Sequence, residues 1–337
     1  MIFSKRIEWS FWTVLFSVIT LLVIAYSLSK GEINIPFTKI PAILMHGQGS
    51  MEYAVLQNIR LPRIYLGLSI GGALSVAGVL LQGIYRNPLV EPYTLGISGG
   101  AALGVALVIV FGLNLSLGAF ILPVAGFAGA VITIFLVYFL SIRRGKMATQ
   151  NMVLIGVMIS FIASSGMMFL MSTATNENLH GIVFWMMGSL DEANSQLISI
   201  SGIVSVVGLA ASYLFVHPLN ALRLGEGNAR HLGVNTDVAI RILFVIASLL
   251  TGMCVSVAGV IGFVGLIIPQ FIRLIVGSDF RILLISSFLA GGSFLVFCDT
   301  IARTIIAPNE LPIGVITGII GGLAFIIIIS KVGQKHR

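Results

Sequence analysis

Two polar stretches carry the residues of this chain that could bind a partner through charge. The first is Arg60-Leu-Pro-Arg63. A third arginine, Arg303, lies much later in the chain, at the end of another apolar run. A guanidinium stays charged and can bind a carboxylate through two parallel hydrogen bonds. The three arginines therefore predict a positive collar for acidic side chains of another protein. The alternative is snorkelling or local ion pairing within the chain. Acidic residues that could form such pairs are Glu52, Asp299 and Glu310.

The second stretch is Gly225-Glu-Gly-Asn-Ala-Arg-His-Leu-Gly233, within the polar segment 219–235. It holds helix-forming residues between two glycines, and Asn228, Arg230 and His231 could face outwards. We expect a short helix along the membrane surface, able to transmit motion from a cytoplasmic motor. A plain surface loop fits the composition equally well.

The composition indicates that most of the chain is surrounded by lipid. Of 337 residues, 57% are hydrophobic and 9% are charged, and the mean hydropathy is +1.06. Soluble domains carry about 25% charged residues. Apolar windows of about 20 residues, the length of a spanning helix, recur along the chain. We therefore predict an all-α polytopic membrane protein with one transmembrane domain over residues 1–337.

Hydropathy places about ten spans. The eighth is short and contains Pro269, which suggests a kinked or re-entrant helix. Between the fifth and sixth, His180–Leu190 is expected to be an interfacial helix with Trp185 at headgroup level. The first run is too long for a cleaved signal peptide, and no cleavage site follows it. The predicted spans are 10–29, 63–84, 93–111, 117–141, 150–172, 191–216, 237–258, 261–276, 280–301 and 311–331.

Charge orients these spans. With both termini cytoplasmic, 14 of the 19 basic residues lie inside, in agreement with the positive-inside rule. The net charge of +7 is then a topology signal facing anionic lipid, and a nucleic-acid partner is not expected. This topology places the arginine collar and the 225–233 stretch on opposite faces. The basic residues left outside are Lys30, Lys39, Arg60, Arg63 and Arg303.

Several classes of function are disfavoured. The predicted spans contain almost no acidic, lysine or histidine side chains away from their ends. An ion-coupled secondary transporter would need such groups to bind its coupling ion within the membrane. The histidines lack metal-ligand spacing, and Cys254 and Cys298 suit packing better than redox chemistry. The twelve methionines favour packing over a soft-metal channel. No P-loop motif is found, so we expect no enzyme activity and no cofactor bound by this chain. A secondary transporter and a structural scaffold remain the alternatives.

Glycine rows indicate how the predicted helices pack, and one repeated motif indicates how they are related to each other. Glycines recur every fourth residue over 96–104 and 314–322, which favours close backbone packing. Ser75-Val-Ala-Gly-Val79 recurs as Ser256-Val-Ala-Gly-Val260 in a span of opposite predicted direction. The pair suggests a weak inverted repeat of the second to fifth and seventh to tenth spans.

Seven segments, in order along nearly the whole chain, resemble the FecCD-type permeases of ABC importers, the group of cobalamin and iron-siderophore permeases. They include Arg60-Leu-Pro-Arg63 and the polar stretch around Gly225–Gly233. Gln270 and Phe280 stand where this family usually has histidine. The remaining segments are Arg86–Ala101, Trp185–Leu190, Gly262–Pro269, Asp299–Arg303 and Glu310–Val315.

The resemblance implies a ten-helix subunit that forms a homodimer around a central pore, with two ATPase subunits and one external binding protein. ATP and Mg would be bound by the ATPases. Arg60, Arg63 and Arg303 would receive glutamates of the binding protein, and Asn87 and Leu89 would lie near a cytoplasmic gate. The ATPase would contact the coupling segment. Its matching residues are Leu224, Gly225, Glu226, Ala229, Arg230, Leu232 and Gly233.

The resemblance also implies a location and a class of cargo. We expect the cytoplasmic (inner) membrane of a prokaryote and a bulky metal chelate. Ferric siderophore is the first expectation, with cobalamin, haem and molybdate- or tungstate-type oxyanions as alternatives.

Overall fold

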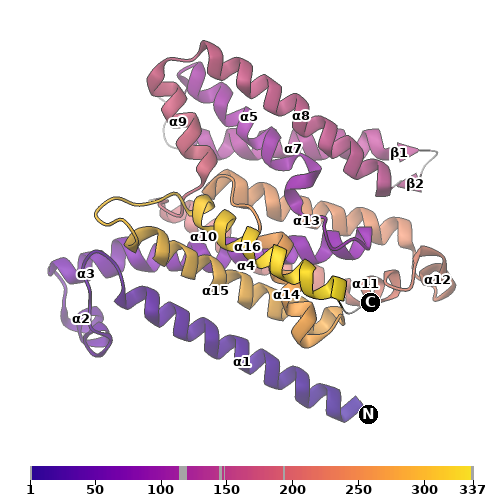
Figure 1. The fold of residues 1–337 in the computed structure, drawn as a ribbon, viewed down its shortest axis with the longest axis horizontal. Coiled ribbons are helices and arrows are strands. Elements are labelled where there is room, and N and C mark those ends of the chain that lie inside the picture. The colour runs from indigo at the N-terminus through magenta and orange to yellow at the C-terminus, as the bar shows by residue number, and fades with distance from the viewer. Residues whose placement is uncertain (1, 114–119, 144–145, 148, 193, 335–337) are drawn as a thin grey trace.

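The computed structural model describes residues 2–113, 120–143, 146–147, 149–192 and 194–334 (Figure 1). Within these ranges, seven helices are long and apolar enough to cross a membrane, and three shorter apolar helices accompany them. Each predicted span corresponds to one of these helices, so the expected count of about ten is confirmed. The predicted start of the fourth span, at residue 117, lies outside the described residues.

The ten apolar helices differ mainly in length. Three have short apolar stretches: α5 (Ile97–Val110), α14 (Val264–Val276) and α16 (Ile313–Gln334), whose apolar part is Ile313–Ile328. The long ones are α1 (Ile2–Ser29), α4 (Leu61–Tyr85), α7 (Ile121–Ser141), α8 (Thr149–Thr173), α10 (Ser195–Leu214), α13 (Thr236–Ala258) and α15 (Phe280–Thr304).

Shorter elements connect the spans. α9 overlaps the predicted interfacial helix His180–Leu190 but ends at Met187. It also begins earlier, where the Thr175 hydroxyl accepts a hydrogen bond from Asn178 N–H. Trp185 of α9 packs against two buried clusters. The strand pair was not predicted, because two residues are too few to show an alternating pattern. The connecting elements are η1 (Phe37–Lys39), α2 (Ile40–His46), α3 (Met51–Val55), η2 (Leu56–Arg60), η3 (Pro92–Leu95), β1 (Ile142–Arg143), β2 (Lys146–Met147), α9 (Asn176–Met187), α11 (Val216–Leu222) and α12 (Glu226–His231).

The bundle has two distinct ends (Figure 1). α2, α3 and the connection from α15 to α16 lie at one end, called the outer end below. The start of α1, the β1–β2 pair, α11 and α12 lie at the other, called the inner end. The arginine-rich stretch and the 225–233 stretch are therefore at opposite ends, as predicted. α4 runs from outer to inner end and α13 runs back, so the repeated Ser-Val-Ala-Gly-Val segments lie on antiparallel helices.

α4 is the central helix, and glycines let its neighbours approach it closely. A Cβ atom on Gly78 would lie 1.9 Å from Gly265 O of α14, and one on Gly71 would lie 2.2 Å from Gly291 O of α15. The helix backbones are thus in direct contact at both crossings. In lipid the hydrophobic effect does not drive helices together, so close packing of this kind stabilises their association instead.

The two predicted glycine rows behave differently. Gly100 and Gly104 of α5 face α7, where a Cβ on Gly104 would lie 2.5 Å from Ala125 O. On α16, a Cβ on Gly318 or Gly322 would meet no atom within 4 Å. Gly314 of the second row is packed, since a Cβ on it would lie 2.3 Å from Met187 O, so among the described residues this row is packed at its start alone.

α14 spans about 20 Å, less than the roughly 30 Å hydrocarbon core of a bilayer. Pro269 lies inside this helix, and Phe263 precedes it with φ of 70°. The Tyr93 hydroxyl donates to Ile261 O at 2.6 Å and accepts from Ile261 N–H at 3.1 Å. It therefore satisfies the non-helical backbone that leads into α14, which buried backbone in a membrane requires.

Candidate functional sites at the two ends of the bundle

Arg63 is the centre of a group of charged side chains at the outer end. Its Nη2 atom lies 2.7 Å from Glu310 Oε2 and 3.0 Å from Asp191 Oδ1, and its Nη1 atom lies 3.8 Å from Asp299 Oδ1. The group joins α4 and α15 to the segments that precede α10 and α16. We call Arg60, Arg63, Asp191, Asp299, Arg303 and Glu310 the outer ionic cluster.

Arg303 holds α15 to α1 within this cluster. Its Nε donates to Asp299 Oδ2 at 2.9 Å, one helical turn earlier, and its Nη2 donates to Ser27 Oγ at 3.1 Å. Ser27 also accepts a hydrogen bond from the Thr300 hydroxyl at 2.9 Å. The side chains of Arg303 and Asp299 are each only 5% exposed, so the pair is largely removed from solvent.

Arg60 is the last residue of a π-helical turn that precedes α4. Proline lacks an N–H group, and its ring collides with the carbonyl four residues earlier in an α-helix. The wider π-helical turn η2 precedes Pro62 and gives that ring room. Arg60, at the end of this turn, points inward and donates to the backbone carbonyls of Leu28 and Ile33.

The three arginines are buried: Arg60, Arg63 and Arg303 are 1%, 5% and 6% exposed. The exposed members of the cluster are acidic, since the side chains of Asp191 and Glu310 are 73% and 48% exposed. The predicted alternative of local ion pairs is therefore present for Asp299 and Glu310. Among the described residues, Glu52 pairs with none of these arginines. Docking of a partner stays a prediction.

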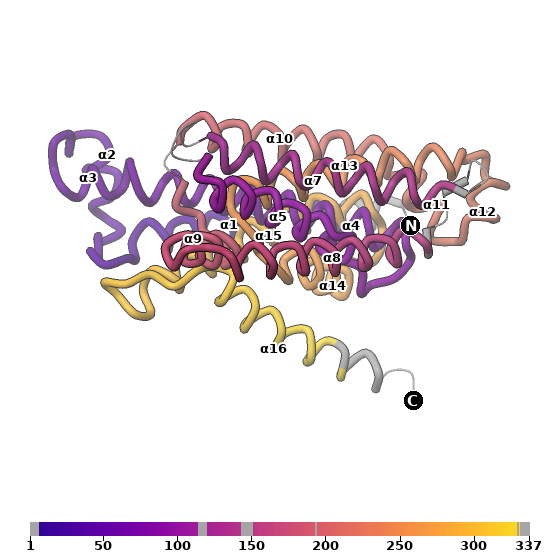
Figure 2. Tube along the Cα trace, turned by 90° about the horizontal axis from the view of Figure 1, so that it is seen from above, coloured from indigo at the N-terminus to yellow at the C-terminus, as the bar shows by residue number. Residues whose placement is uncertain are grey.

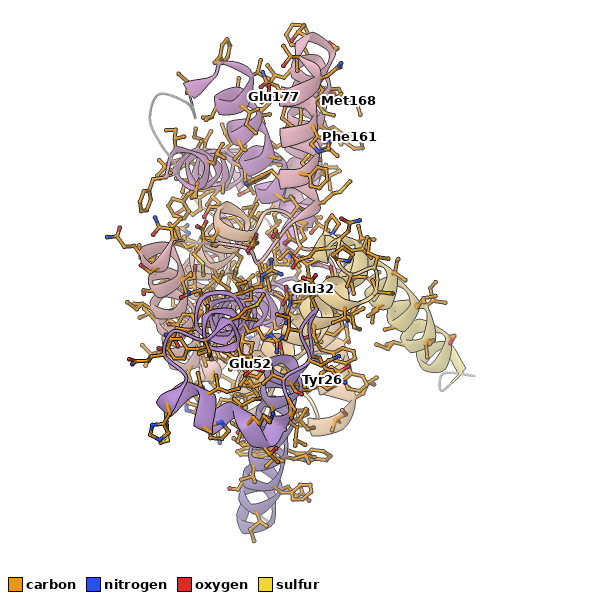
Figure 3. All side chains as sticks on the ribbon, turned by 90° about the vertical axis from the view of Figure 1, so that its left-hand side faces the viewer. Tyr26, Glu32, Glu52, Phe161, Met168 and Glu177 are labelled. Atoms are coloured by element: carbon orange, nitrogen blue, oxygen red, sulfur yellow. The ribbon has the colours of Figure 1, made fainter. Side chains whose placement is uncertain are left out.

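A small cavity of about 100 Å³ opens beside Arg60 and Arg303. Glu32 and Glu310 also line it, and Figure 3 views this end with Glu32 and Glu52 labelled. Over the described ranges no carboxylate lies within ion-pair distance of Arg60. The cavity therefore offers one buried guanidinium that could still pair with an acid.

Asp191, a member of the cluster, and Ser27, which accepts a hydrogen bond from Arg303, were missed because neither is near the arginines in sequence. One signal was available for Asp191. The charge argument that places Arg63 on the external face also places Asp191 there, next to a predicted interfacial helix.

At the inner end, α12 forms the predicted short helix between two glycines. Gly225 and Gly233 have φ of +100° and +81°, values that favour glycine. Ala229 is fully buried, whereas Leu224 and Leu232 are 61% and 63% exposed. Two exposed leucines beside a short helix at this end suit contact with another protein.

Arg230 fixes α12 to the start of α13. Its Nε donates to Thr236 Oγ1 at 2.8 Å, and its Nη2 donates to Asp237 Oδ2 at 3.3 Å. The backbone N–H of Val234 also donates to Ala229 O at 3.1 Å. Glu226 begins α12 and is half-buried. α12 is therefore joined by side-chain and backbone hydrogen bonds to the start of α13.

α11 joins the same region to α15. Asn220 Nδ2 donates to Asp279 Oδ1 at 3.1 Å, and Asn220 Oδ1 accepts from Phe280 N–H at 3.3 Å. Phe280, one of the departures from the family pattern, is 2% exposed, and its ring fills the space beside Gly83. Gln270, the other departure, lines a cavity of about 320 Å³ with Arg86, Arg223 and Arg273.

Asn87 and Leu89 form an exposed turn after α4. Leu89 N–H donates to Asn87 Oδ1 at 2.9 Å, and Arg86 precedes the turn with φ of 50°. A Cβ on Gly225 would lie 3.3 Å from Arg86 Nη1, so the turn adjoins the coupling segment. Its role as a gate stays a prediction.

Glu91, which the sequence did not single out, lies just beyond this turn. Burial raises the pKa of its carboxyl, and a hydrogen bond with the Phe263 backbone opposes that shift. Its Oε2 atom is buried without a hydrogen-bond partner. The residue therefore places a titratable group between α4 and α14.

Comparisons with known proteins agree with the resemblance. The model of the FecCD transport family matches residues 19–331. A cobalamin import system permease of Halobacterium salinarum is 38% identical, over 85% of this chain and 76% of that protein. A hemin transport system permease of Yersinia pestis is 34% identical, over 83% and 84%. A solved inward-facing structure, provisionally assigned as a metal-chelate type ABC transporter, is 29% identical with a TM-score of 0.84, over 95% and 98%.

Proposed function

Because the chain belongs to the FecCD transport family, we propose that it is the permease subunit of an ATP-driven importer of ferric siderophores. Its relatives place it among the ABC importer permeases for metal chelates. The observation that supports the proposed importer assembly is the two-ended arrangement. One end has an ionic cluster beside Arg60, which forms no ion pair with a described carboxylate, and the other end has a short helix flanked by exposed leucines.

The outer ionic cluster would receive the external binding protein. An acidic side chain of that protein could enter the cavity beside Arg60 and Arg303 and pair with Arg60. It could also replace Glu310 or Asp191 on Arg63, because both acids are partly exposed. Docking would then exchange internal ion pairs for intermolecular ones.

The inner end would receive the ATPases, which carry ATP and Mg. Leu224 and Leu232 offer apolar contact area, and Arg230 and Ala229 fix α12 to α13. Movement of the nucleotide-binding partner would thereby reach α13, and through Asn220 also α15. The turn at Asn87 and Leu89 adjoins α12 and would open or close the inner mouth of the pore.

A second copy of the chain would complete the pore. Figure 2 shows α16 leaving the bundle, and Gly318 and Gly322 on it meet no atom within 4 Å. α8 presents Phe161 and Met168, 64% and 70% exposed, on the side to which α16 projects (Figure 3). The face between α8 and α16 is the proposed homodimer and pore surface. Such a pore would lie in a prokaryotic cytoplasmic membrane with both termini inside.

The assembly is tested by purifying the chain from native membranes in mild detergent and identifying its companions by mass spectrometry. We expect a P-loop ATPase at one copy per permease. Recovery of the chain alone, with uptake that ignores ATP and follows an ion gradient, would favour a secondary transporter. Arg60→Gln should abolish binding-protein-dependent uptake yet keep the ATPase; unchanged uptake would favour a structural scaffold.

The cargo is tested separately in cells that lack the chromosomal copy. Uptake of a radio-iron-labelled hydroxamate siderophore should depend on the plasmid-borne chain. Dependence of cobalamin or haem uptake instead would reassign the cargo to that of the Halobacterium or Yersinia relative. Molybdate or tungstate uptake would move the chain to an oxyanion importer.

A further inference from the structure

A cavity of about 480 Å³ lies between α1, α10 and α15 near the inner end. The functional sites described above do not use it. Its polar wall includes Trp9, Tyr213 and Arg281, and its apolar wall includes Val14 and Ile285. A cavity with one cationic and aromatic side and one aliphatic side matches an amphipathic molecule.

The polar residues share one level of the membrane. Trp9 lies near the start of the apolar stretch Ile7–Ser29, and Arg281 is the second residue of Phe280–Thr304. Tyr213 is the last but one residue of Ser195–Leu214. Three spans therefore bring an arginine and two aromatic side chains to the same boundary, where tryptophan and tyrosine prefer to lie.

Arg281 forms no ion pair with a described carboxylate, although Glu8 and Asp279 lie at the same end of the bundle. The Arg281 guanidinium lies 5.9 Å from the centroid of the Trp9 ring, and the side chain is exposed. The adjacent Asp279 accepts instead from Asn220 Nδ2 and from the Arg281 backbone N–H.

The shape of α1 keeps the cavity open. In its outer half, α1 is held to α15 by a hydrogen bond between the hydroxyls of Thr20 and Ser293 at 2.8 Å and by one from Thr300 to Ser27 at 2.9 Å. Toward its N-terminus, α1 diverges from α15 (Figure 1). The opening contains the cavity, and Val14, 61% exposed, lies on the side nearer the bilayer centre.

We propose that this cavity binds one anionic phospholipid of the inner leaflet. Its phosphate would pair with Arg281 and accept a hydrogen bond from the Tyr213 hydroxyl, with Trp9 at headgroup level. An acyl chain would lie along Val14 and Ile285. Basic pockets between helices on this side of a membrane recognise anionic headgroups in this way. The lipid would join the free half of α1 to α10 and α15, whatever cargo the transporter carries.

Quenching of Trp9 fluorescence by brominated lipid tests the proposal in the full-length protein reconstituted into vesicles. Trp12→Phe and Trp185→Phe leave Trp9 as the only tryptophan. Brominated phosphatidylglycerol should quench Trp9 with about fivefold preference over brominated phosphatidylcholine, the effect of one cation near an anionic surface. Arg281→Gln should remove the preference, and Arg281→Lys should keep most of it.

Three outcomes would overturn the assignment. Equal quenching by the two lipids would exclude selective binding. A matched loss in Arg223→Gln, another exposed arginine at the inner end, would indicate general surface charge. Relief of quenching by inorganic phosphate at constant ionic strength would assign the cavity to a soluble phosphate. If the tryptophan replacements disturb folding, native mass spectrometry of the wild type and Arg281→Gln should show an anionic lipid retained only by the wild type.

Discussion

Arg63 and Glu310 are 247 residues apart in sequence, yet Arg63 Nη2 lies 2.7 Å from Glu310 Oε2. The pair connects the start of α4 with the segment before α16, and Asp299 behind it connects the same arginine with α15. Arg63, Arg303 and three acids thus form one group joined by ion pairs, and Arg60 lies beside it, bonded to backbone carbonyls.

Asp299→Asn is expected to destabilise the protein by about 3 kcal/mol, because it leaves two buried guanidiniums without their shared carboxylate. Glu310→Gln removes a half-exposed partner and should cost less than about 1 kcal/mol. Thermal unfolding midpoints of both variants in one detergent measure the difference. An equal loss in the two variants would contradict the burial argument.

Gly78→Ala is expected to shift α4 from α14 and lower the unfolding free energy by about 1–3 kcal/mol, the range for overpacked cores. The added Cβ would lie 1.9 Å from Gly265 O, a backbone atom that cannot rotate away. Gly262→Ala is the matched control, since a Cβ there meets nothing within 4 Å. The yield of monodisperse protein and its thermal midpoint give the comparison. Similar values for the two variants would argue against backbone contact at this crossing.

Glu91→Gln is expected to flatten the dependence of stability on pH. Burial raises the pKa of Glu91 above its unfolded value of about 4.3. The buried site accommodates the protonated carboxyl better than the carboxylate. The stability that this preference gives the folded state is fully present below the unfolded pKa and is lost as pH rises through the folded pKa.

The thermal midpoint of the wild type should therefore fall relative to Glu91→Gln as the pH rises from the unfolded pKa of about 4.3 through the raised folded pKa. Glu177→Gln, at an exposed position of α9, is the control and should run parallel to the wild type. A constant difference between Glu91→Gln and wild type across this range would rule out titration of Glu91.

Leu232→Ser is expected to reduce retention of the ATPase about tenfold, because burying one leucine contributes about 1.5–3 kcal/mol. Met45→Ser removes a similarly exposed apolar side chain at the outer end and should leave retention unchanged. The amount of ATPase that co-purifies with each variant is the measurement. Equal retention by all three proteins would exclude Leu232 from the contact.

The positions of the spans could be predicted because hydropathy is a local property of the chain. α13 and α15 begin within one residue of their predicted starts. Glycine also gave a correct local signal, at the two glycines that bound α12. The short length of α14 agrees with the sequence, whereas the kink or re-entrant course suggested by Pro269 stays a prediction. These signals depend on neighbouring residues alone.

The surroundings of the arginines could not be predicted in the same way. Sequence spacing suggested a positive collar for acidic side chains of a partner. It did not indicate that Arg60 would be 1% exposed and bonded to the backbone carbonyls of Leu28 and Ile33. Those acceptors belong to every residue type, so no sequence pattern identifies them. The contact of Arg63 with Asp191 depends on how α4 lies against the segment before α10, which only the assembled bundle determines.

α15 has one anchor at each end: Asp279 bonded to Asn220, and Arg303 bonded to Asp299 and Ser27. Twenty-five helical residues extend for about 37 Å without an internal proline. A rod of this length that turns about its crossing with Gly71 converts a shift at one anchor into an opposite shift at the other. A single tilting helix would then let the two sides of the membrane sense each other without any relay of side chains between them.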